Sequence, residues 1–175
     1  MAVDLERQFK PINIALLTVS DTRGPEDDTS GDILAARITG AGHHLIARAI
    51  EKDDPARIVS RFNNWLDDRR IDCIITTGGT GLTGRDVTPE AMTRIMDKEI
   101  PGFGELFRWL SYKTIGTSTI QSRAMGVIAR GRYIFALPGS NGAVKDGWDG
   151  ILAEQLDSRN RPCNFVELMP RLNEV

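Results

Sequence analysis

The sequence contains few cysteines and carries little net charge. Only two cysteines, Cys73 and Cys163, occur among the 175 residues, and they lie far apart along the chain. This leaves no disulfide framework and no closely spaced cysteine pair of the kind that binds zinc. Cys73 lies inside an apolar run and is expected to be a small buried core residue.

The formal net charge is only −2. A chain without an excess of basic residues is not expected to attract nucleic acid broadly, so a polyanion would have to be bound at a local site. No stretch approaches the roughly 18 apolar residues of a membrane span, and the first residues lack the apolar segment of a secretory signal. These absences favour a cytoplasmic protein that binds neither nucleic acid nor membranes.

What the chain does contain is an ordinary globular composition, with 41% apolar and 26% charged residues. A chain of 175 residues fits one domain with a sizeable core. No linker, internal repeat or low-complexity segment interrupts it. We therefore interpret residues 1–175 as a single domain, in which 1–11 form a polar lead-in.

Strand-like and helix-like segments alternate along the chain. The predicted strands are 12–19, 44–50, 71–77, 125–129 and 133–137, with a short one expected at 165–168. Helices are predicted in the segments between them, the first capped by Ser30 and the second by Asp54 with Pro55 at its first position. Helix-length crossovers between strands indicate an α/β fold with a mostly parallel central sheet.

The most informative segment follows the third predicted strand. Four of the seven residues 78–84 are glycine, so backbone N–H groups there can turn toward a bound anion. Asp86 comes directly after this glycine loop and could hold a metal ion against phosphate oxygens. Thr88 is the better cap for the next helix, with Pro89 at its first position, which leaves Asp86 without a structural role. The pattern predicts a phosphate site closed by a metal-binding carboxylate.

Two known phosphate-binding motifs share part of this spacing. Residues 79–84 spell G-x-G-x-x-G, but that dinucleotide fingerprint belongs to the first βα turn of its fold, and here the loop follows the third strand. A P-loop would continue with Lys and Ser or Thr, whereas this chain has Arg85 and Asp86. A plain surface turn is the remaining alternative. Of these readings we favour a distinct phosphate cradle.

Several segments together resemble one protein family. Residues 76–81 and 85–91 are similar to the signature of the MoaB/Mog molybdopterin-binding proteins, whose fold also occurs in the G domain of gephyrin. Further similar segments are 19–22, 101–105, 116–124, 137–140 and 161–165, so the resemblance covers nearly the whole chain. The last of these resembles the MoaB branch. The resemblance implies a three-layer α/β sandwich.

The resemblance also implies a step in molybdenum cofactor biosynthesis. Active members of the family adenylylate molybdopterin: its terminal phosphate attacks the α-phosphorus of ATP, and pyrophosphate leaves. Such a reaction would use Mg²⁺ as cofactor and ATP as co-substrate. Members of the MoaB branch are not uniformly active, so the alternative is a non-catalytic protein that only binds molybdopterin. The family forms homotrimers and the MoaB branch homohexamers, and Trp65, Trp109 and Trp148 are expected in the core or in such an interface.

The family pattern places two acidic residues at the site. They align with Asp86 and with Asp53, although the neighbouring Asp54 is an alternative to Asp53. Both are predicted to be catalytic and to bind the metal. The phosphate- or nucleotide-binding candidates are Gly78, Gly79, Thr80 and Gly81. The substrate-binding candidates are Ser20, Asp21, Ser118, Ser122, Arg123, Pro138, Gly139 and Ser140.

Overall fold

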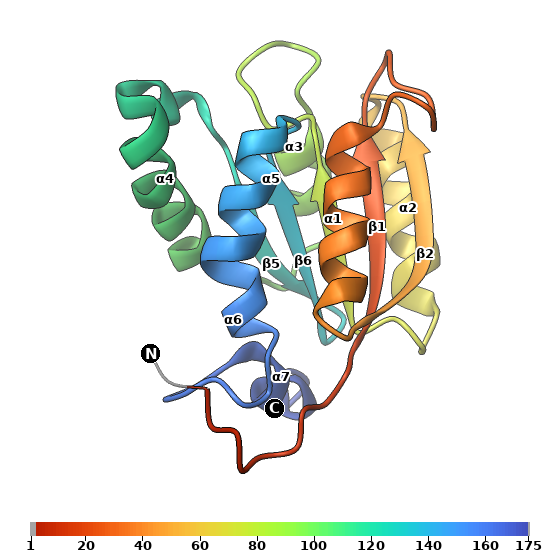
Figure 1. Ribbon diagram of the computed structural model, residues 1–175. Helices are drawn as coiled ribbons and strands as arrows, with labels where there is room; N and C mark the ends of the chain where they lie inside the picture. Colours follow the sequence, from red (N-terminus) through yellow and green to blue (C-terminus); the bar gives the residue numbers. More distant parts are fainter. Residues whose placement is uncertain (1–2, 175) are drawn as a thin grey trace.

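A six-stranded sheet forms the centre of the computed structural model, which describes residues 3–174 (Figure 1). Its strands are β1 (Asn13–Val19), β2 (His44–Glu51), β3 (Cys73–Thr77), β4 (Lys98–Glu99), β5 (Met125–Ala129) and β6 (Arg132–Leu137). They lie in the order β2-β1-β3-β6-β5-β4. The first four in that order are parallel to one another, and β5 and β4 are antiparallel to their neighbours. The predicted mostly parallel sheet is confirmed.

Helices cover both faces of the sheet and make three layers. They are α1 (Thr29–Gly40), α2 (Pro55–Asp67), α3 (Thr88–Thr93), α4 (Pro101–Ile115), α5 (Asn141–Gly147), α6 (Ala153–Gln155) and α7 (Phe165–Leu168). A 3-10 turn (Gly116–Gln121) follows α4, a π-helical turn (Trp148–Leu152) joins α5 to α6, and a last 3-10 turn (Met169–Arg171) follows α7. Within residues 3–174 no helix combines the length and the apolar character that crossing a bilayer demands.

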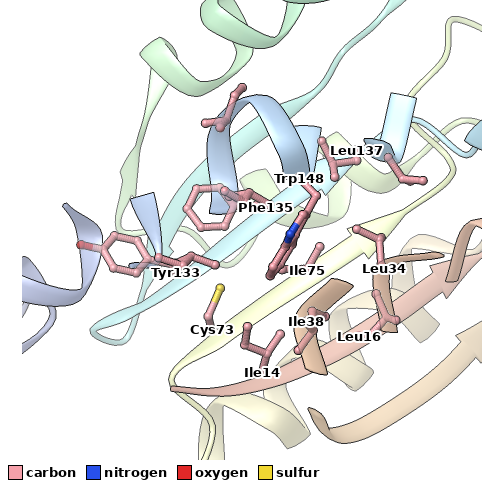
Figure 2. Close-up of a cluster of buried hydrophobic side chains, with 14 of the residues drawn as sticks. Ile14, Leu16, Leu34, Ile38, Cys73, Ile75, Tyr133, Phe135, Leu137 and Trp148 are labelled. Atoms are coloured by element: carbon pink, nitrogen blue, oxygen red, sulfur yellow. The ribbon is translucent and has the colours of Figure 1, made fainter. Parts of the chain in front are cut away.

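Alternating side chains of the buried strands face two separate cores. Ile14 and Leu16 of β1 join the core under α1, α4 and α5, which also contains Trp148 and Phe135 (Figure 2). The intervening Ala15, and Leu17 after Leu16, join the core under α2 and α3. This is the period of two that places successive strand residues on opposite faces. Because both faces are covered, the strands read as continuous apolar runs.

The first helix is capped by a residue other than the predicted one. Asp28, not Ser30, is the N-cap of α1, and its carboxylate accepts a 3.0 Å hydrogen bond from the Gly31 N–H. Asp28 is fully buried, where it also accepts from the Thr18 hydroxyl at 2.7 Å and pairs with Arg48. Ser30 lies one residue inside the helix. Asp28 thus caps the helix and has hydrogen-bond partners for its buried carboxylate.

The C-terminal segment also differs from the prediction. Residues 165–168 form α7 and not a strand, because the Asn164 side chain accepts a 2.9 Å hydrogen bond from the Glu167 N–H and caps a helical turn. The described part of the polar lead-in packs beside this segment, with Arg7 paired to Glu167. Trp65 and Trp148 are buried as expected, whereas Trp109 is 59% exposed.

Candidate functional site

The glycine loop opens into a cleft of about 610 Å³ at the carboxyl ends of the parallel strands. Predicted site residues line it from four connections: Ser20 after β1, Asp53 after β2, residues 78–81 after β3, and residues 138–140 after β6. Asp86, Ser118 and Ser122 also line it. In open α/β sheets this edge is where ligands bind. Figure 1 shows the connection between β3 and α3 rising above this end of the sheet.

Two glycines in the loop adopt conformations that side chains rarely allow. Gly78 has φ +99° and Gly79 has φ +64°. A Cβ at Gly78 would lie 2.1 Å from the Val19 carbonyl oxygen, and one at Gly79 would lie 2.4 Å from Thr88 Oγ1. The bare backbone is therefore required for the loop to pass this close to β1 and α3. The main chain of this loop is therefore exposed to the cleft at these glycines.

Both predicted metal-binding carboxylates lie against this bare backbone. A Cβ at Gly79 would come within 3.0 Å of Asp53 Oδ1, and one at Gly81 within 2.8 Å of Asp86 Oδ2. The loop thus brings the two acids to one wall of the cleft although they are far apart in the sequence.

Asp53 and Asp54, which the sequence left as alternatives, have separate positions. Asp54 caps α2, accepting hydrogen bonds from the backbone N–H groups of Ala56 at 2.8 Å and Arg57 at 3.1 Å. Asp53 lines the cleft and is only 9% exposed. Burial, and then the negative charge of Asp21, raise the pKa of Asp53 above its ordinary value. A desolvated carboxylate beside another acid favours a nearby cation.

Asp86 does have a structural role, so the expectation that it has none is wrong. Its Oδ2 accepts hydrogen bonds from the backbone N–H of Thr83 at 2.9 Å and from the Thr83 hydroxyl at 2.6 Å. These bonds close the glycine loop on itself. Burial alone would raise the pKa of Asp86, but the bonds from Thr83, the backbone of Gly81 and the positive charge of Arg123 together hold that pKa below its usual value. Asp86 is therefore ionised and oriented.

The predicted cap at Thr88 is also wrong. Helix α3 begins at Thr88 itself, and Val87 stands at the N-cap position without a side-chain bond. The Thr88 hydroxyl instead donates to the Gly78 carbonyl oxygen at 2.9 Å. It ties the start of α3 to the start of the glycine loop.

Two of the predicted substrate-binding residues do not line the cleft. Arg123 supports the loop through hydrogen bonds from Nε to the Gly81 carbonyl and from Nη2 to the Asp86 carbonyl, both at 2.7 Å, and pairs with Glu90. Asp21 forms a bidentate pair with Arg85 at 2.8 Å and accepts a 3.2 Å bond from the Asp53 N–H. That pair holds the pKa of Asp21 below its ordinary value.

The other wall of the cleft comes from α4 and α5, and sequence reasoning missed most of it. Helix α4 contributes Phe107, Ser111 and Ile115 to this wall, and α5 contributes Asp146. The Ser111 hydroxyl donates a long hydrogen bond of 3.4 Å to the Asp146 carboxylate. The spacing of these α4 residues in the sequence predicts that they share one face of a helix. It does not indicate that this face lines a site. The cleft thus joins an anion-binding loop to a mixed apolar and hydroxyl-bearing wall.

The donor set at the loop fits a hard divalent cation. Mg²⁺ is usually held by one or two carboxylates together with water and substrate phosphates, which is what Asp53 and Asp86 beside the loop can supply. No group of three or more His, Cys, Asp or Glu residues suited to a metal ion occurs within residues 3–174. Two carboxylates beside a loop suited to phosphate fit a metal that arrives with a phosphorylated ligand.

Comparison with known proteins gives a consistent result. A family model described as a probable molybdopterin binding domain matches residues 15–158. Molybdenum cofactor biosynthesis protein B of Escherichia coli (strain K12) is 48% identical over 158 residues, covering 90% of this chain and 93% of that protein. The protein of the same name from Bacillus subtilis (strain 168) is 39% identical over 159 residues, covering 89% and 94%.

Solved structures agree with the sequence relatives. A crystal structure of a molybdenum cofactor biosynthesis protein B is 35% identical with a TM-score of 0.86, covering 97% of this chain and 100% of that one. The tungsten cofactor synthesizing protein MoaB of Pyrococcus furiosus is 31% identical with a TM-score of 0.79, covering 94% and 99%.

Proposed function

The chain belongs to the molybdopterin-binding family of molybdenum cofactor biosynthesis proteins and is of the MoaB type, and from this premise we propose that it adenylylates molybdopterin with Mg-ATP. The terminal phosphate of molybdopterin attacks the α-phosphorus of ATP. A phosphoanhydride bond forms between the two, the bond to the β-phosphate breaks, and pyrophosphate leaves with its electron pair. The product is adenylylated molybdopterin.

One observation carries this proposal: two carboxylates, Asp53 and Asp86, lie against the bare backbone of a glycine loop in one cleft. Transfer between phosphates depends chiefly on positioning and on neutralising charge. The loop supplies backbone N–H groups for phosphate oxygens. Mg²⁺ held by the two carboxylates would neutralise charge that develops on the phosphates.

The remaining cleft residues suit the rest of the two substrates. Ser20, Ser118 and Ser122 offer hydroxyl groups to the polar atoms of pterin or phosphate, and Phe107 and Ile115 offer apolar contact to a flat ring. Residues 138–140 bring a further backbone segment to the same cleft. Arg123 acts through the loop that it supports, as a positioning residue.

The test is to incubate the purified protein with molybdopterin, ATP and Mg²⁺ and to measure pyrophosphate and adenylylated pterin. Asp86→Asn is expected to abolish turnover while molybdopterin affinity stays within a few-fold of the parent, because Asp86 is assigned to the metal and not to the pterin. Asp54→Asn is the matched control: asparagine caps a helix as well as aspartate, so turnover should persist. Turnover of Asp86→Asn at the parent rate would contradict the assignment. A parent protein that binds molybdopterin but releases no pyrophosphate would instead be the non-catalytic alternative.

We also propose that copies of this chain associate into a homotrimer or homohexamer. Leu106, Trp109 and Tyr112 recur every three residues along α4 and are all exposed. Ile115 and Ile120 extend this apolar surface into the following turn. Large apolar side chains gathered on one surface are unusual for a monomer and support an interface between subunits.

A further inference from the structure

Two cations line the proposed nucleotide cleft, and they are held very differently. Arg23 donates from Nη1 to the Ser30 hydroxyl at 2.8 Å and from Nη2 to the Gly139 carbonyl at 2.9 Å. These bonds to neutral partners tie the connection after β1 to α1 and to the connection after β6, so Arg23 is a fixed part of the wall. Arg85 is held by a carboxylate, that of Asp21, which does not itself line the cleft.

The Arg85–Asp21 pair is poised to exchange its partner. Both bonds are 2.8 Å long, but the Arg85 side chain is 65% exposed and that of Asp21 is 36% exposed. Ion pairs between exposed side chains are weak. Pairing of this kind favours the paired over the separated side chains by about fivefold or less. A polyphosphate carries more charge than a carboxylate and accepts the same two parallel bonds from a guanidinium. Arg85 therefore gains by leaving Asp21 when a polyphosphate enters.

Charge in the cleft strengthens this argument. The lining of the cleft includes three acidic side chains and two cationic ones. The acids are Asp53, Asp86 and Asp146, and the cations are Arg23 and Arg85. With Arg85 neutralised by Asp21, the lining is unfavourable to a highly charged anion. When Arg85 leaves Asp21, its guanidinium becomes available to an anion inside the cleft, and the uncovered carboxylate of Asp21 does not line the cleft.

We propose that Arg85 is a phosphate-binding residue held in reserve by Asp21, and that it transfers from Asp21 to the polyphosphate chain of the nucleotide when that substrate binds. This inference rests on the proposed function, which supplies the nucleotide. Asp21 then acts as a competitor for Arg85, and it lowers nucleotide affinity without contacting the substrate.

The test is a double-mutant cycle on binding, measured by titration calorimetry without molybdopterin so that no turnover occurs. The probes are Mg-ATP and inorganic tripolyphosphate. Arg85→Gln should weaken binding of both probes about tenfold, the loss expected for one charged bidentate contact. Asp21→Asn should strengthen binding by up to about fivefold. The double variant should bind like Arg85→Gln alone, because the gain requires Arg85.

A matched control separates partner exchange from simple loss of charge. Arg37 and Asp149 form an equivalent bidentate pair, also at 2.8 Å in both bonds, and neither lines the cleft. Asp149→Asn should leave the affinity unchanged. If Asp21→Asn strengthened binding equally in the Arg85→Gln background, or if Arg85→Gln bound as the parent does, the proposal would be overturned.

Failure of the wider proposal looks different. If the parent bound neither Mg-ATP nor tripolyphosphate, both the proposed adenylyl transfer and this inference would be refuted. If the parent bound both and the cycle were additive, only the exchange of Arg85 would be wrong. Should Asp21→Asn fail to fold, the exposed Arg85→Gln variant decides alone, with unchanged Mg-ATP affinity as the refuting result.

Discussion

Gly81→Ala is expected to displace the Asp86 carboxylate and leave the rest of the fold in place. The new Cβ would lie 2.8 Å from Oδ2 of Asp86 and 3.0 Å from its Cγ and Oδ1. Since carbon and oxygen pack at about 3.5 Å, the carboxylate must move by roughly 0.5–1 Å. A misplacement of about 1 Å at a catalytic group can cost about 100-fold in rate. We therefore expect adenylyl transfer to fall by about two orders of magnitude.

The effect on stability should be far smaller. The moving carboxylate weakens the two hydrogen bonds from Thr83, and bonds of this kind contribute about 0.5–1.5 kcal/mol each. Unfolding in urea should show a loss of about 1 kcal/mol, while pyrophosphate release reports the rate.

Gly84→Ala is the matched control, because it lies in the same loop and nothing stands within 4 Å of its new Cβ. It should keep the parent rate and gain about 0.4–1 kcal/mol from a stiffer unfolded chain. Equal rates for Gly81→Ala and Gly84→Ala would refute the reasoning.

Two further predictions concern charge and assembly. Asp53→Asn should abolish transfer yet raise the unfolding temperature in metal-free buffer at neutral pH, because burial and Asp21 raise the pKa of Asp53 and its charged form destabilises the fold. The difference in unfolding temperature between the variant and the parent should shrink as the pH falls through the raised pKa of Asp53 toward the ordinary 3.8. In that range Asp53 of the folded parent takes up a proton and loses its destabilising charge. Calorimetry across this pH range checks both statements, and a lower midpoint for the variant at neutral pH would contradict them. Light scattering should give the mass of three or six chains of 19.3 kDa, and Trp109→Glu should reduce it toward one. A monomer mass for the parent protein would contradict the proposed interface.

Local patterns predicted the elements whose cause is local. Asp54-Pro55 starts α2 because the cap and the first helical position are adjacent residues. The predicted strands 125–129 and 133–137 form the β5–β6 hairpin, whose turn residues Arg130 and Gly131 have positive φ, of 49° and 72°, as a two-residue turn requires. The apolar run ending at Val19 became β1 with an error of one residue at its start.

Elements that depend on distant partners were missed or misread. β4 is only two residues long and exists because Lys98 and Glu99 pair with Ile128 and Val127 of β5. No local pattern marks such a strand. Asp28 was overlooked as a cap because its burial depends on Arg48, which arrives from β2. The same holds for Arg123, which the family resemblance suggested for substrate and which the fold directs to the carbonyl groups of the glycine loop.

The structural role of Asp86 does not compete with its proposed role at the metal. A carboxylate has two oxygens with about four acceptor sites, and both bonds from Thr83 end on Oδ2. Capacity to bind a cation therefore remains, on a group whose orientation is already fixed. A metal ligand positioned before substrate arrives loses little entropy on binding, which is how a site gains precision from supporting hydrogen bonds. The sequence argument treated a structural role as evidence against function, whereas here the bonds that close the loop are the ones that aim the carboxylate.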